Sequence, residues 1–209
     1  MNVMRTQGLY SPRVAARVAR IKYQHFQAWS KANLIHPRKL KTGAGDETVY
    51  TYEDLLLMRL IARLREHGVR PREIRVALDT IALMSQGDTR AWMKATLYVA
   101  NGVIVVVLPD MADWTPVAAS RGPQKMALVF FPDLLRDLER DLVPPDRFPH
   151  VEIDPEVLGG TPVVRGTRIP TRAITEVSQA GEDPRVAYPS LTNEQVRNAE
   201  EYEGFLAAA

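Results

Sequence analysis

Residues 36–50 read HPRKLKTGAGDETVY, a basic and turn-rich segment that lies between stretches of helical sequence. Three cations, Arg38, Lys39 and Lys41, come before its Gly-Ala-Gly turn. Glycines spaced in this way mark a turn at the surface, so the cations are expected to face solvent or a partner. We interpret the segment as a basic wing, and the sequence on either side of it decides the fold.

A helix, a short break and a second helix are predicted upstream of the wing. Ser11-Pro12 is a good helix start, because serine caps free amides and proline fits the first helical turn. After a break near residues 20–22, the stretch YQHFQAWSKANL places Phe26 and Trp29 three residues apart on one buried side. Asn33 is suited to close this second helix, because asparagine tolerates the left-handed conformation.

Two more helices are predicted downstream. Thr51 and Asp54 form a capping signal for a helix that ends at Gly68, and Pro71 opens the next one. Helix, turn, helix, basic wing and helix is the order of a winged helix-turn-helix. We therefore predict this fold for residues 1–80.

The charge of the chain is unevenly distributed. Residues 1–75 carry 15 Lys and Arg against 6 Asp and Glu, whereas residues 76–209 carry 12 against 19. A basic N-terminal segment in an otherwise acidic chain indicates an anionic partner for that segment, most often nucleic acid. The alternative is that the uneven charge only reflects solvent-exposed side chains and that no anionic partner is involved. The candidate DNA contacts are Arg20, Lys22, Tyr23, Gln24, Gln27, Arg38, Lys39 and Lys41.

The middle of the chain is rich in strand sequence. Residues 96–108, TLYVANGVIVVVL, predict two strands around an Asn-Gly hairpin turn, and KMALVFF near residue 125 predicts a third. A sheet of so few strands is only marginally stable alone, and packing against a second copy of the chain is the simplest way to stabilise it. We interpret residues 81–147 as a dimerisation segment that ends in a proline-rich linker, Val143–Pro149.

An unusual stretch, LGGTPVVRGTRIP, occupies residues 158–170. It is not a Walker phosphate loop, because Gly160 to Gly166 encloses five residues where that loop has four, and no Lys-Ser/Thr follows. Its glycines permit positive-φ turns and its prolines restrict their flanks. We interpret it as a rigid turn scaffold that presents or anchors Arg165 and Arg168.

Short helices follow this stretch. Thr171 is expected to cap a helix that ends at Gly181, Asp183-Pro184 starts a brief turn, and Thr192 with Gln195 makes a capping box. Residues 148–209 are therefore predicted to be a small helical module. The predicted fold class for the chain is α+β.

Several classes of protein are excluded or disfavoured. The chain has no cysteine, which removes disulfides, thiol catalysis and cysteine-ligated zinc. Its longest clear apolar runs have six residues, far below the ~18 of a membrane span, and the start lacks a signal peptide's apolar core. Four scattered histidines show no metal-ligand spacing. We expect a cytoplasmic protein without metal, cofactor or catalytic activity.

The first segment resembles a known family. The matching patterns are Ala15-Ala16, Phe26-x-x-Trp29, Leu34-Ile35-x-Pro37, Val49–Leu55 and Leu64-Arg65-Glu66-x-Gly68-Val69. Over roughly residues 9–80 they resemble the MerR-like DNA-binding domain, which implies a dimer that binds duplex DNA. Asn33 stands where that family usually has glycine, and the absence of cysteine sets this chain apart from mercury regulators.

The last segment resembles a small bacterial domain of unknown function that occurs in VapB-type antitoxins. The match rests on Asp154-Pro155, Gly159-Gly160-x-Pro162, Arg165–Pro170, Gly181, Tyr188-Pro189 and Leu191-Thr192, and covers about residues 150–203. Six residues lie between Gly181 and Tyr188, where the family usually has a couple more. A shortened middle helix is therefore expected.

The resemblance implies a PIN-domain ribonuclease toxin as partner. Such toxins hold divalent metal ions with clustered carboxylates, and an arginine can enter that pocket with bidentate hydrogen bonds. Arg165 and Arg168 are the candidates; alternatively they are internal and pair with Asp154, Glu156 or helix carboxylates. A rival contact is the acidic end NAEEYEGFLAAA, residues 198–209, with Tyr202, Phe205 and Leu206 as apolar anchors.

Two functions remain open from sequence. The first is an antitoxin that neutralises its toxin and represses its own operon as a homodimer. The second is a MerR-like transcription regulator that responds to a small ligand.

Overall fold

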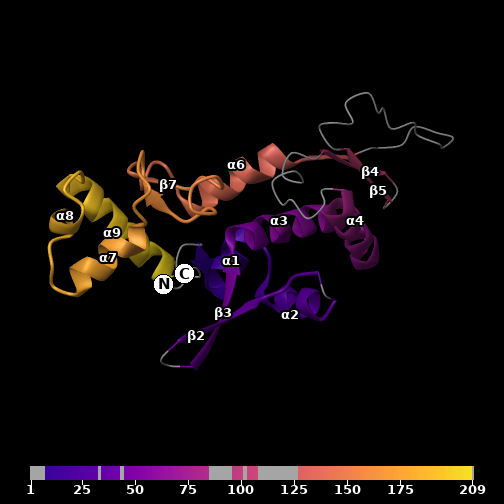
Figure 1. The fold of residues 1–209 in the computed structure, drawn as a ribbon. Coiled ribbons are helices and arrows are strands. Elements are labelled where there is room, and N and C mark those ends of the chain that lie inside the picture. Colours follow the sequence, from indigo (N-terminus) through magenta and orange to yellow (C-terminus); the bar gives the residue numbers. More distant parts are fainter. Residues whose placement is uncertain are drawn as a thin grey trace. The chain divides into compact units, whose positions relative to one another are not determined.

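The computed structural model describes residues 8–32, 34–42, 45–84, 96–100, 103–107 and 127–208 (Figure 1). Within these residues helices accompany small antiparallel sheets, so the α+β class is confirmed. Contacts divide the chain into two compact units: Met1–Val18 with Pro37–Leu55 and Leu138–Ala209, and Ala19–His36 with Leu56–Asp137. No described helix is long and apolar enough to cross a membrane. The division into segments 1–80, 81–147 and 148–209 stays a prediction.

Helix α1 (Pro12–Ala19) begins as the sequence predicts. The Ser11 hydroxyl oxygen accepts from the backbone N–H of Val14 at 3.3 Å. Arg20, at φ 56°, breaks the helix, and α2 (Tyr23–Lys31) starts three residues later. Asn33, the expected helix terminator, lies outside the described residues.

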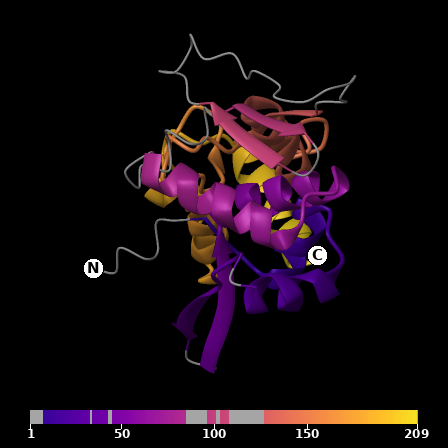
Figure 2. The same ribbon diagram turned by 90° about the vertical axis from the view of Figure 1, so that its right-hand side faces the viewer.

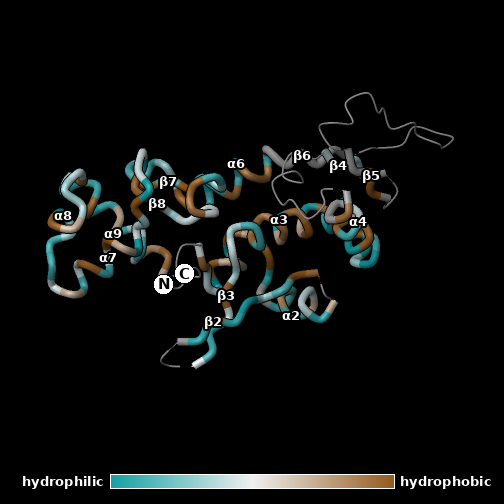
Figure 3. Tube along the Cα trace, viewed as in Figure 1, coloured by the Kyte–Doolittle hydropathy of each residue, from teal (hydrophilic) through white to brown (hydrophobic). Residues whose placement is uncertain are grey.

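The predicted wing is a hairpin of β2 (Arg38–Thr42) and β3 (Gly45–Thr51) with Lys39 opposite Thr48 (Figure 2). A short strand that the sequence did not predict, β1 (Leu9–Tyr10), pairs with the end of β3. The sheet order is β1-β3-β2. In Figure 3 β2 is hydrophilic, in keeping with its exposed cations.

Helix α3 (Tyr52–Glu66) is capped by the pair that the sequence indicated. The Thr51 N–H donates to Asp54 Oδ2 at 2.7 Å, and the Asp54 N–H donates to Thr51 Oγ1 at 3.3 Å. These two bonds satisfy backbone donors that a helix start leaves free. Gly68, at φ 78°, ends the segment as expected.

The second unit has its own core. Phe26, Trp29, Leu34 and Ile35 are buried, as expected. Helix α4 (Pro71–Met84) lies against β5 in a sheet of order β5-β4-β6. The strands are β4 (Thr96–Ala100), β5 (Val103–Val107) and β6 (Ala127–Phe130), which confirms the three that the sequence predicted. The Asn101-Gly102 turn lies outside the described residues.

The C-terminal part of the first unit is a module of short elements around a small core. They are β7 (Val151–Glu152), β8 (Val163–Val164), α7 (Thr171–Gln179), α8 (Pro184–Ala187) and α9 (Asn193–Ala207). Its core contains Val164, Ile174, Leu191 and Ala199. The capping box of Thr192 and Gln195 is present, and α8 is as short as expected.

Two sequence interpretations of this region are wrong. Thr171 does not cap α7; it is the first helical residue, and its hydroxyl donates to Glu203 Oε1 at 2.5 Å. Val143–Pro149, which follows α6 (Phe131–Leu142), is not a plain linker, because Phe148 is fully buried with its ring edge-on to Tyr202, at 5.2 Å between centroids. Asn198 of α9 also donates to the carbonyl of Arg147 and accepts from the N–H of His150, so the proline-rich turn is fixed against α9.

Candidate nucleic-acid interface and C-terminal module

The wing presents its cations on an ordered strand. Arg38, Lys39 and Lys41 are all exposed on β2. Because side chains alternate along a strand, Lys39 and Lys41 share one face and Arg38 faces the other. Lys39 Nζ donates to Thr48 Oγ1 on the neighbouring strand at 2.9 Å, which restrains its ammonium group. Exposed cations of this kind contact phosphates and give affinity without sequence information.

Helix α2 offers a polar face of a different kind. Gln24 and Gln27 are exposed, and Phe26 and Trp29 on the opposite side are buried. Arg20 and Lys22 are exposed in the turn before the helix, and the side chain of Tyr23 lies outside the described residues. A glutamine amide carries both a donor and an acceptor, so it can read a base edge in a major groove.

The glycine-rich stretch makes a tight left-handed turn in contact with the N-terminal part of its unit. Leu158, Gly159 and Gly160 have φ values of 48°, 62° and 75°. The Tyr10 hydroxyl donates to the carbonyl of Gly160 at 3.2 Å. A Cβ on Gly160 would lie 2.5 Å from Cγ of Tyr52. The second glycine is therefore required by its backbone angle and by this close approach.

Arg165 and Arg168 are both exposed. Arg165 Nη2 donates to the carbonyl of Val151 at 3.2 Å, and its backbone N–H donates to the carbonyl of His150 at 2.8 Å. Neither arginine forms an ion pair with a carboxylate in the described part of the chain. Asp154 Oδ1 instead accepts from the backbone N–H of Glu156 at 2.8 Å. The turn is held by backbone bonds and by the Arg165 guanidinium, and both arginines keep exposed surface.

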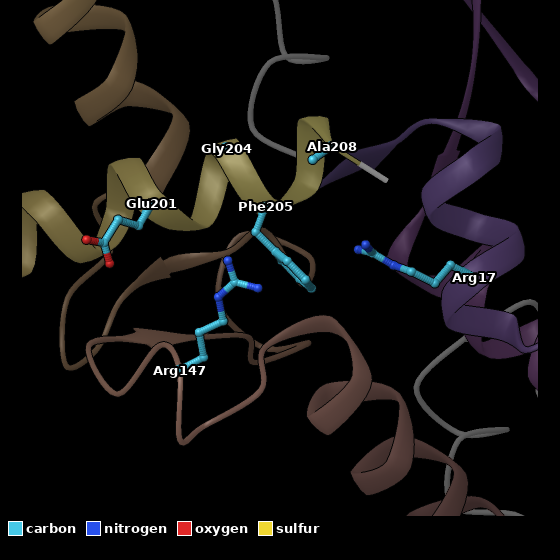
Figure 4. Close-up of a pocket in the computed structure, with 6 residues that line it drawn as sticks. All are labelled: Arg17, Arg147, Glu201, Gly204, Phe205 and Ala208. Carbon is cyan, nitrogen blue, oxygen red and sulfur yellow. The ribbon is translucent and has the colours of Figure 1, made fainter.

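The acidic C-terminal end belongs to helix α9, which has one buried face. Tyr202 has no exposed surface, so its assignment as a toxin anchor is wrong. Burial raises the pKa of its hydroxyl, which has no hydrogen-bond partner among the described residues. Phe205 is half-buried, with Arg17 4.4 Å and Arg147 4.9 Å from its ring centroid (Figure 4).

Two family models match this chain. MerR HTH family regulatory protein matches residues 10–81, and DUF433, described as a protein of unknown function, matches residues 151–202. The chain thus carries a MerR-type helix-turn-helix domain. A DUF433 domain follows it. The described residues contain no group of three His, Cys, Asp or Glu that could hold a metal ion.

Similar proteins include regulators from mycobacteria. The uncharacterized HTH-type transcriptional regulators Rv1830 of Mycobacterium tuberculosis and Mb1861 of Mycobacterium bovis are 30% identical over 87 residues, 36% of this chain. The chain spans only 39% of their length. The crystal structure of Rv2018 from Mycobacterium tuberculosis has a TM-score of 0.42 and 17% identity, covering 91% of this chain and 95% of that one.

The DUF433 domain contacts the start of the MerR-type domain through residues that sequence reasoning missed. Tyr10 and Tyr52 meet Gly160, and Arg17 meets Phe205. None of these contacts leaves a local signal, because the partners lie more than one hundred residues apart in the chain. The sequence signal for them was the Gly159-Gly160 pair, which indicated a turn with unusual backbone angles but not that this turn contacts Tyr10 and Tyr52.

Proposed function

We propose that this chain is a homodimeric, cytoplasmic repressor that binds its own operator and neutralises a PIN-domain ribonuclease toxin through its DUF433 domain. The observation that carries the DNA-binding part is the MerR-type match over residues 10–81, joined to an exposed strand with three cations. The relatives' names, HTH-type transcriptional regulators, support a role in transcription. We propose no catalytic role.

The two sets of side chains have different roles in this proposal. Gln24 and Gln27 on α2 read base edges, as the second helix of a helix-turn-helix does. Lys39 and Lys41, with Arg38 and the turn residues Arg20 and Lys22, neutralise phosphates. A dimer presents two such heads, so the operator contains two half-sites related by the protein's two-fold symmetry.

The test compares variants in salt-dependent operator binding. Lys39→Ala weakens binding to operator and random DNA alike and lowers the slope of log K against log salt by about 1. Gln24→Ala with Gln27→Ala instead lowers the ratio of operator to random affinity. Arg172→Ala removes an equally exposed cation from the DUF433 domain and serves as control. Unchanged operator affinity after substitution of Gln24, Gln27 and Lys39 together would refute the proposal.

The toxin contact is assigned to Arg165 and Arg168. Both are exposed on a turn that hydrogen bonds already hold, so little conformational entropy is lost when they dock into an acidic pocket. Alanine at both positions is expected to release ribonuclease activity in the reconstituted complex while the unfolding temperature stays nearly constant. Inhibition retained together with a large loss of stability would assign them a structural role.

Truncation is an unsuitable test of the rival contact, because deletion of residues 203–209 would remove Phe205 and Glu203, which pack inside the module. For the alanine substitutions of Arg165 and Arg168, Arg172→Ala again serves as the matched control. Co-purification with the product of the adjacent gene tests whether a toxin is the partner. A second candidate function, a MerR-like regulator that responds to a small ligand, is favoured by a cavity of about 430 Å³ that Arg17, Arg147 and Phe205 line.

A further inference from the structure

A cavity of about 430 Å³ lies beside α9 in the first unit. The residues that line it are Arg17, Arg147, Glu201, Gly204, Phe205 and Ala208 (Figure 4). Arg17 comes from α1 of the MerR-type domain and Arg147 from the turn after α6. Glu201, Gly204 and Phe205 come from α9, and Ala208 is the residue that caps its C-terminal end. The cavity is therefore built jointly by the MerR-type domain and the region that contains DUF433.

Its two arginines carry charge without a carboxylate partner. Neither Arg17 nor Arg147 forms an ion pair within the described residues; both lie over the ring of Phe205, and Arg147 also lies over Phe148. Burial lowers the pKa of Arg17, so its charge is partly desolvated. A guanidinium over an aromatic ring is stabilised through its face, which leaves N–H groups at its edge to donate. Two cations with free donors in one cavity attract an anion.

The remaining charge in the lining is Glu201. Its Oε1 lies 3.9 Å from Nε of Arg197, and both side chains are largely exposed. Figure 4 shows its carboxylate pointing away from Arg17. Glu201 therefore marks a negative edge on the Arg147 side, while the wall formed by Phe205, Gly204 and Ala208 is apolar.

We propose that this cavity binds a small organic dianion, with one anionic group on Arg17, the other on Arg147 and a short spacer along Phe205. The size suits a metabolite-sized ligand. Figure 4 shows the Phe205 ring between the two guanidinium groups, each within 5 Å of the ring centroid, so they match two separate carboxylates or phosphates better than one. The apolar wall accepts the spacer. Carboxylate and phosphate share this chemistry, because both accept charge-assisted hydrogen bonds from arginine.

The ligand would join α1 to α9, and its regulatory role rests on the proposed DNA-binding function. A dianion bridging the two arginines favours the docked arrangement of the two parts of this unit. By linkage, an effector that stabilises one arrangement changes operator affinity by the ratio of its affinities for the two arrangements. The binding site itself does not depend on that role.

The experiment is isothermal titration calorimetry of the full chain, without DNA and at constant ionic strength. The probes are succinate, citrate, inorganic phosphate and glycerol 3-phosphate, with succinamide as the neutral control. Binding of succinate or citrate in preference to the phosphates identifies a carboxylate ligand, and the reverse order a phosphate ester. Arg17→Gln and Arg147→Gln are each expected to weaken binding about 10-fold or more. Neither arginine belongs to the buried core, although each lies over the ring of Phe205.

Two matched variants complete the test. Glu201→Gln removes the negative edge and is expected to strengthen binding by about 2-fold to 5-fold. Arg172→Gln, an exposed cation outside the cavity, leaves binding within about 2-fold. The proposal is overturned if no charged probe binds at about 10 mM, if succinamide binds equally well, or if either arginine variant retains full affinity. It is also overturned if Arg17→Gln and Arg147→Gln lower DNA affinity while none of the probes binds the wild-type chain, since the arginines then contact DNA.

Discussion

The contact between Gly160 and the N-terminal part of its unit can be tested with one methyl group. Gly160→Ala places a Cβ 2.5 Å from Cγ, 2.7 Å from Cβ and 3.0 Å from Cδ1 of Tyr52. Tyr52 is fully buried, so its ring has no solvent to move into. The same substitution also introduces a side chain at φ 75°.

The expected cost has two parts. A left-handed conformation costs a non-glycine residue about 1–2 kcal/mol, and forcing an extra methyl into a packed site costs about 1–3 kcal/mol. Gly160→Ala is therefore expected to lower the free energy of unfolding by roughly 2–5 kcal/mol. Gly166→Ala and Gly181→Ala separate the two parts, because φ is 75° and 81° at these glycines and a Cβ there would meet nothing within 4 Å.

The assay is differential scanning calorimetry of the three variants. Tryptophan fluorescence is unsuitable, because Trp29, the tryptophan in the described part of the chain, belongs to the other unit. For a chain of this size about 1 kcal/mol shifts the transition by ~2–4 °C. Gly160→Ala is expected to unfold ~2–12 °C below the two control variants.

Equal unfolding temperatures for Gly160→Ala and Gly166→Ala would contradict the predicted clash with Tyr52. A double-mutant cycle adds a second criterion. In a Tyr52→Ala background the ring is absent but Cβ stays 2.7 Å from the new methyl, so the added cost of Gly160→Ala should fall toward that of the controls without reaching it. A cost that stays the same in that background would show that the turn does not meet Tyr52.

Three further predictions concern charge, hydroxyl groups and assembly. Burial raises the pKa of Glu203, so the stability of the wild type is greatest below the unfolded-state pKa of about 4 and declines as pH rises through the folded-state pKa. In urea titrations the wild type should therefore lose stability relative to Glu203→Gln as pH rises above about 4. Tyr202→Phe removes a hydroxyl with no described hydrogen-bond partner and should be nearly neutral, whereas Tyr10→Phe loses the bond to Gly160 and should cost about 1 kcal/mol; equal costs by calorimetry would contradict this. Val105 is half-buried opposite Tyr98, on the sheet face away from buried Leu97 and Val99; Val105→Lys should give monomers by light scattering, and a monomeric wild-type chain would rule the dimer out.

The sequence predicted helix ends better than it predicted what helices contact. Ser11, the Thr51–Asp54 pair and the Thr192–Gln195 box each act on backbone groups three residues away, so their chemistry is contained in the local sequence. The burial of Phe26 and Trp29 followed from helical spacing in the same way. Periodicity identifies a buried face but does not identify its partner.

The errors share one physical cause. Phe148 in an apparent linker and Tyr202 in an apparent tail are ordinary aromatic residues until they meet across the fold. Strand β1 is two residues long and exists only because β3 offers it a partner. The cavity beside Phe205 was equally invisible, because Arg17 and Arg147 are unremarkable in their own segments. The exposed cations of the wing could be predicted, because charge and turn chemistry are local.

The hydrogen bond between Tyr10 and Gly160 limits when the first unit can finish folding during translation. Its partners are 150 positions apart in the chain, and at about 5–20 residues per second the ribosome needs roughly 8–30 s to add that length. For most of this interval both Tyr10 and Tyr52 have been made and the turn that covers them has not. The first unit therefore completes its folding only after translation has reached the DUF433 domain, and a nascent chain that stops earlier leaves two tyrosines open to chaperones and proteases.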